Sequence, residues 1–207
     1  MSKRLVALSA AYGAGGRWIG TAVASRLELP FLDRAIARSV AARLDVSLDE
    51  ALQQEEPPGL TLLERLLSSF AGADTGAPVP LPAEHITAED FHHASQQAVR
   101  EQVATGEGVI LGRGAVAALR DDPRVLRVRL SGPVPGRLQR ALAVNDVDRA
   151  TALRTLRRVD RMHAEYLRQF HEVAIDDPAL YHLSIDSTSM GLEACVDLIE
   201  LAAGAVN

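Results

Sequence analysis

The stretch RLVALSAAYGAGGRWIGTAVASRL, residues 4–27, decides the fold of this chain. Its first six residues form a short apolar run, which predicts a buried strand. Glycines follow at once, and the residues after them carry apolar side chains four apart, as in a helix: Ile19, Val23 and Leu27. A strand, a glycine turn and a helix in this order predict the opening of a βαβ unit.

The rest of the chain alternates short apolar runs with helical patterns, as a parallel sheet with helices on both faces requires. A long helical region is predicted over Arg137–Phe170, with Asn145 as the place for an interruption. We therefore expect one α/β domain over residues 1–207. Its further strands are predicted over Leu29–Asp33, Gly108–Leu111, Val125–Leu130 and Tyr181–Ile185.

The composition limits the classes of function. A chain with 47% hydrophobic and 24% charged residues is globular, and its net charge of −5 argues against a surface built for nucleic acid. Lys3 is the only lysine, so a bound phosphate has to be met by arginine, backbone N–H groups or a metal. The single cysteine, Cys195, excludes an intrachain disulfide. With no signal-peptide pattern and no apolar run of about 20 residues, we expect a cytoplasmic protein without membrane contact.

The glycine turn has the features of an anion site. Glycines 13, 15 and 16 would let a phosphate approach backbone N–H groups at a helix N-terminus, where the helix dipole is positive. The usual P-loop pattern, however, requires lysine and then serine or threonine, where this chain has Gly16 and Arg17. From the pattern alone, a purely structural turn remains the alternative.

Five segments in order resemble one family. They are SAAYGAGGRWIG at 9–20, PFLD at 30–33, VILGRG at 109–114, RRVDRMHAEY at 157–166 and DPALYHLSIDSTSMG at 177–191. Together they resemble the cytidylate kinase-like family, an offshoot of the nucleoside monophosphate kinases. The resemblance covers most of the chain and is weakest between about residues 45 and 95.

The resemblance implies a three-layer fold of the P-loop NTPase type, with a parallel five-stranded sheet flanked by helices. The core would comprise about residues 1–33, 104–136 and 181–207. A helical substrate-binding insert would occupy about residues 34–103, and an arginine-rich lid about residues 137–170.

The resemblance also implies site residues. Gly13, Ala14, Gly15, Gly16 and Arg17 would cradle a nucleotide phosphate, and Arg17 is the nearest cation to replace the absent lysine. Arg113 would hold the phosphate of the acceptor, although Gly114 stands where the family has an aspartate. Asp33 would contact substrate or metal. The alternatives are a surface arginine at a strand end for Arg113 and a helix cap for Asp33.

Two later segments complete the expected site. Arg161 and Arg168 would bring positive charge from the lid to the transferring phosphoryl group, whose charge spreads over its oxygens. A run of helical arginines is otherwise a solvated face that pairs with Asp160 and Glu165. Asp186 and Ser187 would lie beside the nucleotide base, or cap the last helix, or do both.

The implied activity is an ATP-dependent phosphotransferase that acts on a small phosphate acceptor, CMP or dCMP, with ATP and Mg²⁺. We expect no metal site made by protein side chains alone and no nucleic-acid partner. The alternative is a nucleotide-binding regulatory module with weak or no kinase activity, because the P-loop lysine and hydroxyl are replaced. Another acceptor is a third reading. Leu60–Phe70 is apolar enough for the core of the insert or for a homodimer face.

Overall fold

The computed structural model describes residues 5–32, 88–112, 114–145 and 147–205. The chain divides into two compact units, Met1–Asp33 with Gln102–Asn207, and Arg34–Glu101. In the second unit the described residues belong to α5 (Ala88–Thr105), which runs on into the first unit. Asp33, Arg113 and the predicted helix Leu60–Phe70 lie outside the described residues. The sheet and the candidate site belong to the first unit.

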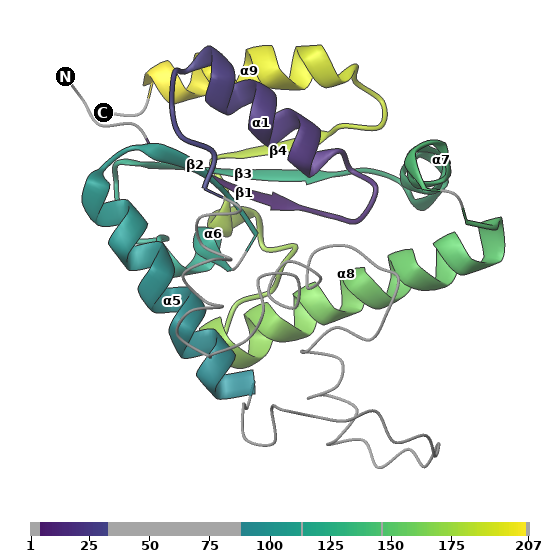
Figure 1. The fold of residues 1–207 in the computed structure, drawn as a ribbon, viewed down its shortest axis with the longest axis horizontal. Helices are drawn as coiled ribbons and strands as arrows, with labels where there is room; N and C mark the ends of the chain where they lie inside the picture. Colours follow the sequence, from purple (N-terminus) through teal and green to yellow (C-terminus); the bar gives the residue numbers. More distant parts are fainter. Residues whose placement is uncertain (1–4, 33–87, 113, 146, 206–207) are drawn as a thin grey trace. The chain divides into compact units, whose positions relative to one another are not determined.

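The centre of the first unit is a parallel sheet with the strand order β2-β1-β3-β4 (Figure 1). Its register sets Leu5 of β1 beside Gly108 of β2 and Val125 of β3. All four strands therefore end at one edge, where ligands of α/β proteins bind. The strands are β1 (Leu5–Ala10), β2 (Gly108–Leu111), β3 (Val125–Ser131) and β4 (Leu183–Asp186).

The expected fifth strand is not confirmed. Of the segment Leu29–Asp33, Phe31 forms one isolated parallel bridge with Val109 of β2. The Leu32 N–H donates to the Val109 carbonyl, and the Val109 N–H donates to the Pro30 carbonyl, both at 2.9 Å. Pro30 has no N–H to extend the ladder, so among the described residues this segment marks the sheet edge without forming a strand.

Helices cover both faces of the sheet in this unit (Figure 1). On one face α1 (Gly16–Arg26) and α9 (Leu192–Ala205) pack together over the strands. Their buried side chains join those of β1 and β3 in one apolar core, which includes Val6, Leu8, Ile19, Val23, Val128, Leu130, Val196 and Ile199. On the other face lie the short α6 (Ala115–Ala118) and the long α8 (Arg149–His171).

The region expected to be a lid consists of two helices, α7 (Val134–Val144) and α8. The interruption expected at Asn145 is confirmed, since Asn145 ends α7 and Asp148 begins α8. The Asp148 carboxylate accepts hydrogen bonds from the N–H groups of Ala150 and Thr151, at 2.8 and 3.0 Å, as an N-cap does. Leu138 of α7 packs in a small core with Ala152 and Leu156 of α8. Closure of this region as a lid stays a prediction.

The two faces of the sheet differ in polarity. Val6 and Leu8 of β1 point into the apolar core with α1 and α9. On the α8 side the same strands carry Ser9 and Arg129, which are paired in register, and the Arg129 Nη1 donates to the Ser9 Oγ at 2.9 Å. Parallel sheets are usually apolar on both faces, so polar side chains at the ligand-binding edge indicate a functional surface.

Candidate functional site

The turn between β1 and α1 has the conformation that its glycines allow. Gly13 and Gly15 both have φ of +77°, in the left-handed region that side chains disfavour, and Gly15 is the N-cap of α1. The Ala11 N–H extends the β1 ladder to the Leu130 carbonyl at 2.9 Å, and the Ala14 N–H closes back on the Ala11 carbonyl at 3.0 Å. The turn therefore wraps tightly around the first residue of the helix.

Gly16 lies where an ordinary P-loop has its lysine, and the structure has no room for a side chain there. A Cβ atom on Gly16 would collide with the Cβ of Ala10 and lie 3.2 Å from the Leu111 Cδ1. The close packing of α1 on β1 and β2 therefore requires glycine at residue 16 and excludes a lysine there. Arg17, the next residue, is exposed on the first turn of α1.

The carbonyl groups of the turn are all occupied by protein donors. The Arg137 Nη1 donates to the Tyr12 carbonyl at 2.9 Å, and the Ser187 hydroxyl donates to the Ala14 carbonyl at 2.7 Å. Arg140 reaches the Gly13 carbonyl at 3.5 Å. Within the described part of the chain, by contrast, the backbone N–H groups of three turn residues donate no hydrogen bond: Gly13, Gly15 and Gly16. Open N–H groups at a helix N-terminus form a concave site for an anion.

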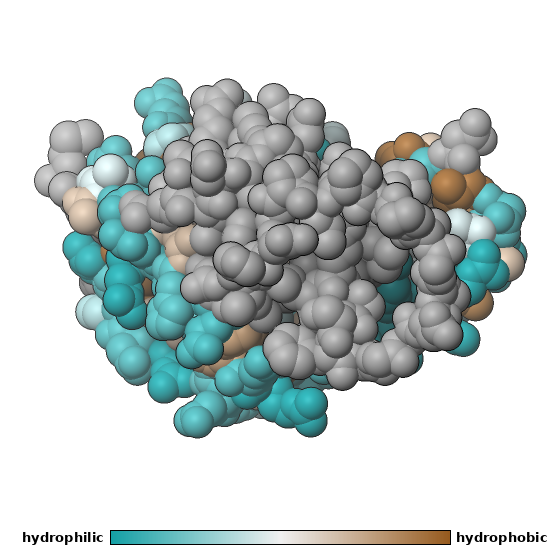
Figure 2. Space-filling model, turned by 60° about the horizontal axis from the view of Figure 1, so that its bottom comes forward, coloured by the Kyte–Doolittle hydropathy of each residue, from teal (hydrophilic) through white to brown (hydrophobic). Residues whose placement is uncertain are grey.

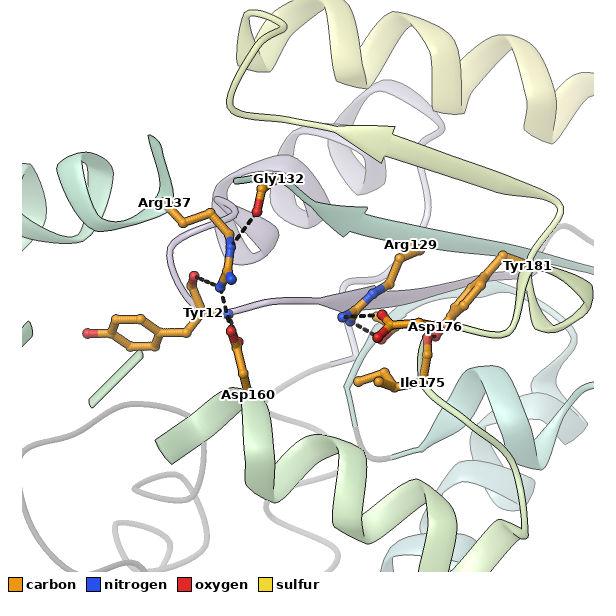
Figure 3. Close-up of polar contacts among 9 residues, drawn as sticks. Tyr12, Arg129, Gly132, Arg137, Asp160, Ile175, Asp176 and Tyr181 are labelled. Atoms are coloured by element: carbon orange, nitrogen blue, oxygen red, sulfur yellow. Dashed lines mark hydrogen bonds and ion pairs between the residues drawn. The ribbon is translucent and has the colours of Figure 1, made fainter. Parts of the chain in front are cut away.

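Two helices outside the βα unit hold the turn (Figure 3). Asp160 of α8 accepts from the Tyr12 N–H at 3.2 Å and pairs with the Arg137 Nη1 at 2.8 Å. The Arg137 Nε also donates to the Gly132 carbonyl at 2.8 Å. Arg137 and Asp160 are therefore functional candidates that the sequence did not reveal, since Asp160 was considered only as a partner for arginines of its own helix.

Asp186 and Ser187, expected beside the base, have internal roles. The Asp186 carboxylate accepts from the N–H groups of Thr188 and Ser189 and from both of their hydroxyls. These hydrogen bonds favour the charged form and lower the pKa of Asp186 to about 2. Ser187 is fully buried, and the Arg140 Nη2 donates to its carbonyl at 2.7 Å. Asp186 thus closes the turn over residues 187–189 and does not cap α9, whose first residue is Leu192, while contact with a base stays a prediction.

The arginines of α8 form a stripe beside Asp160. Arg154, Arg157, Arg161 and Arg168 are exposed, whereas Arg158 is half-buried. Neither Arg161 nor Arg168 forms a hydrogen bond or ion pair with a described residue. Figure 2 turns the bottom of Figure 1 forward and shows mainly hydrophilic surface where described residues reach this face. The role of the two arginines in transfer stays a prediction.

A second glycine turn follows β2, where the acceptor was expected. Arg113 is outside the described residues, but its neighbours Gly112 and Gly114 both have positive φ, +72° and +66°. A Cβ on Gly114 would lie 2.7 Å from the His171 Nε2 and 2.9 Å from the Tyr166 Cε1. The end of α8 therefore fills the space that the family's aspartate would need.

A buried polar cluster lies under the sheet between these turns. Arg129 is 11% exposed, its Nε has no hydrogen-bond partner among the described residues, and its nearest carboxylate, Asp176, lies 3.9 Å away (Figure 3). Burial, with the Arg129 charge as a second cause, lowers the pKa of His163. Burial raises the pKa of Tyr181, whose hydroxyl donates to the Ile175 carbonyl at 2.7 Å. Sequence reasoning missed this cluster, because a lone arginine in a strand pattern carries no spacing signal.

Comparison with known proteins now adds to this geometry. The profile of the cytidylate kinase-like family matches residues 5–189. The chain belongs to this family. The match spans both glycine turns, α7, α8 and the strand that ends at Asp186, and it supports a phosphotransferase. No curated protein sequence matches significantly.

Solved structures of similar fold are distant in sequence. An uncharacterized protein from Eubacterium ventriosum is 19% identical, with a TM-score of 0.68 over 98% of this chain and 99% of that chain. A shikimate kinase from Acinetobacter baumannii in complex with shikimate is 16% identical, with a TM-score of 0.51 over 98% and 94%. One from Bacteroides thetaiotaomicron is 13% identical, with a TM-score of 0.53 over 96% and 97%. At these identities the likeness concerns the fold alone.

A kinase family implies a nucleotide and Mg²⁺. The open N–H groups of the first turn fit a nucleotide phosphate. For the metal, no three His, Cys, Asp or Glu side chains come together among the described residues. In the part of the chain that the structure describes, no helix has both the length and the apolar character for crossing a membrane.

Proposed function

We propose that this protein transfers the γ-phosphoryl group of ATP to a small phosphate acceptor, CMP or dCMP. The observation that carries the proposal is the polarity of the first glycine turn. Its carbonyls accept from Arg137, Arg140 and Ser187, while the N–H groups of its three glycines, residues 13, 15 and 16, donate to no described residue. A turn arranged in this way receives an anion with backbone dipoles that need no reorganisation.

In this proposal each element has one task. The N–H groups of residues 13–17 hold the β-phosphate of ATP, and Arg17 supplies positive charge in place of the lysine. Arg113 holds the acceptor phosphate at the end of β2. Arg161 and Arg168 neutralise the transferring group, whose path lies in line between donor and acceptor. Mg²⁺, when bound, would neutralise phosphate charge, with Asp33 or water outside it.

The choice of CMP or dCMP rests on the family and on the two glycine turns at one edge of the sheet. The family name refers to cytidylate, and in this proposal each of the two turns binds one phosphate. Because ATP is made and used inside cells, the proposal includes a cytoplasmic location. It includes no nucleic-acid partner, since the net charge of the chain is −5.

A nucleotide-binding regulatory module is the second candidate. Its specific support is the crowding at Gly16, which leaves no place for the P-loop lysine, together with Arg17 where the Mg²⁺-binding hydroxyl is expected. Such a protein would bind ATP in the same turn and transfer its phosphate slowly or not at all. Both candidates use the same turn, so an experiment has to separate binding from transfer.

The test is to incubate the protein with ATP, Mg²⁺ and a panel of nucleoside monophosphates, with shikimate added because shikimate kinases share the fold. ADP and the phosphorylated acceptor are measured directly, and ATP binding is measured by calorimetry. Formation of CDP or dCDP supports the proposal. ATP binding without any transfer overturns the proposal in favour of the regulatory module. Transfer to shikimate would show that shikimate, and not CMP or dCMP, is the acceptor.

A matched pair of glycine variants tests the turn. Gly15→Ala places a side chain at φ of +77° and 3.0 Å from the Leu192 Cδ2, so ATP binding should fall at least tenfold, by about 1.4 kcal/mol or more. Gly204→Ala in α9 adds the same atoms where no other atom lies within 4 Å, and it should bind ATP like the wild type. Equal ATP affinity in the two variants would remove the turn from the proposed site.

A further inference from the structure

The ion pair between Arg137 and Asp160 connects three separate parts of the chain. Arg137 is in the first turns of α7 with its side chain 8% exposed, and Asp160 is in the middle of α8 with its side chain 30% exposed. Their nitrogen and oxygen lie 2.8 Å apart. Both side chains also bond to the backbone of Tyr12, at the start of the glycine turn (Figure 3).

The pair satisfies both backbone groups of Tyr12. The Tyr12 N–H donates to the Asp160 Oδ1 at 3.2 Å, and the Tyr12 carbonyl accepts from the Arg137 Nη1 at 2.9 Å. The next residue, Gly13, packs so closely on α7 that a Cβ there would collide with the Arg137 carbonyl oxygen. The path of the chain into the turn is therefore fixed by two helices that are far away in sequence.

The charges of the pair matter for an anion site. A carboxylate that accepts from the N–H of Tyr12 lies next to the place where a phosphate would bind, and by itself it would repel that phosphate. The Arg137 guanidinium is close enough to compensate this charge. Asp160 can thus hold the turn without weakening its affinity for an anion, provided that Arg137 is present.

The same pair fixes the rotation of α8. Asp160 points to the turn, and the exposed arginines of α8 lie before and after it at helical spacings that place them on one adjacent stripe: Arg154, Arg157, Arg161 and Arg168. Arg161 is the next residue after Asp160. A helix tied to the turn at residue 160 therefore carries its arginines in one defined orientation relative to the turn.

We propose that Asp160 and Arg137 are positioning residues. Together they hold the glycine turn open for a nucleotide phosphate and orient the arginine stripe of α8 toward it. This inference rests on the proposed function for its consequence in ATP binding, while the effect on the turn itself can be measured without a ligand.

The test uses Arg137→Met, Asp160→Asn and the double variant, with full-length protein. Arg137→Met leaves Asp160 uncompensated beside the phosphate, so calorimetry with ATP and Mg²⁺ should show affinity reduced by at least about tenfold. Asp160→Asn should reduce it less, because the amide keeps an oxygen for the Tyr12 N–H. Adding Asp160→Asn to Arg137→Met should restore part of the lost affinity, since the repelling charge is gone.

A purely structural ion pair would behave differently. Its loss would lower thermal stability in all three variants, and the double variant would bind ATP no better than Arg137→Met. That result overturns the proposal. Arg137→Lys, which keeps a positive charge, serves if Arg137→Met does not fold, and it should bind ATP more tightly than Arg137→Gln.

Hydrogen exchange separates this inference from the proposed function. Without ligand, Asp160→Ala should speed amide exchange of Ala14, whose N–H donates to the Ala11 carbonyl within the turn, by at least about tenfold relative to β3. Asp122→Ala, which breaks the Arg124–Asp122 pair at the opposite end of β3, should leave the turn unchanged. Unchanged exchange in Asp160→Ala overturns the inference. Faster exchange in a protein that binds no ATP supports the coupling and overturns the proposed function alone.

Discussion

The two faces of the sheet differ in polarity, and we expect them to contribute differently to stability and to binding. The face under α1 and α9 is lined by fully buried aliphatic side chains, such as Leu8, Ile19 and Ile199. The face toward α8 carries Ser9 and Arg129 at the strand ends, with Asp160 and His163 among the residues of α8. Apolar burial stabilises a fold without specifying a ligand, whereas buried polar groups need defined partners. The comparison predicts that substitutions on the first face change stability, and that those on the second change binding more.

The largest loss of stability is expected on the apolar face. Ile199→Ala removes three buried carbon atoms from a side chain with no exposed surface and should lower the free energy of unfolding by about 2–5 kcal/mol. Urea denaturation followed by circular dichroism measures this change. Leu201→Ala in the same helix is the control, because Leu201 is 75% exposed. Similar losses in the two variants would contradict the division between the faces.

The next effect concerns the boundary between the faces. Gly16→Lys introduces the lysine of the P-loop pattern, but its Cβ would collide with Ala10, so the free energy of unfolding should fall by about 1–3 kcal/mol. ATP affinity, measured by calorimetry, should not improve. Arg17→Lys places the same side chain on the exposed first turn of α1 and should leave stability unchanged. A gain of ATP affinity in Gly16→Lys would show that a side chain at residue 16 fits beside Ala10 and Leu111, against this prediction.

On the polar face, removal of a buried side chain should change the free energy of unfolding less, or even increase it. Arg129→Met removes a buried charge whose Nε has no hydrogen-bond partner among the described residues, so the free energy of unfolding should change by less than about 1 kcal/mol or rise. Arg127→Met is the comparison, since the Arg127 Nε donates to the Leu180 carbonyl at 2.9 Å. Arg127→Met should lower the free energy of unfolding by about 1 kcal/mol, because this hydrogen bond is lost. Urea denaturation measures the free energy of unfolding of both variants. A greater loss for Arg129→Met than for Arg127→Met would contradict the prediction.

The smallest effect depends on pH. The pKa of Asp186 is lowered to about 2, so its contribution to stability is complete above about pH 4 and is lost as the pH falls toward 2. The melting temperature of Asp186→Asn should therefore fall less steeply over this range than that of the wild type. An NMR titration should place the midpoint of the Asp186 carboxyl near 2. A midpoint near 4 would show that the hydrogen bonds to Thr188 and Ser189 do not hold in solution.

Local patterns predicted the elements that depend on neighbouring residues. The β1–turn–α1 unit and the break at Asn145 both follow from spacing, glycine conformation or side-chain capping within a few residues. The parallel sheet followed from the alternation of strands and helices. The single bridge at Phe31, in place of a full strand, depended on how Pro30 meets the sheet edge, which no local pattern contains.

The site itself was predicted only in part. The glycines of the first turn were identified because their conformation is encoded in their own residues. The contact of Asp160 with Arg137 was not predicted, because helical spacing points to the arginines beside Asp160 and the contact arises only when α7 packs on α8. The absence of a lysine at residue 16 and of an aspartate at residue 114 looked like lost function. The structure shows that Ala10, Tyr166 and His171 occupy the space such side chains would need.

The hydrogen bond from the Ser187 hydroxyl to the Ala14 carbonyl joins residues 173 positions apart. During synthesis the ribosome makes the glycine turn long before Ser187. The turn therefore lacks one of its donors until β4 and Ser187 have been translated. If the turn binds ATP as proposed, ATP can stabilise the complete turn only after β4 has joined the sheet and Ser187 has reached the Ala14 carbonyl.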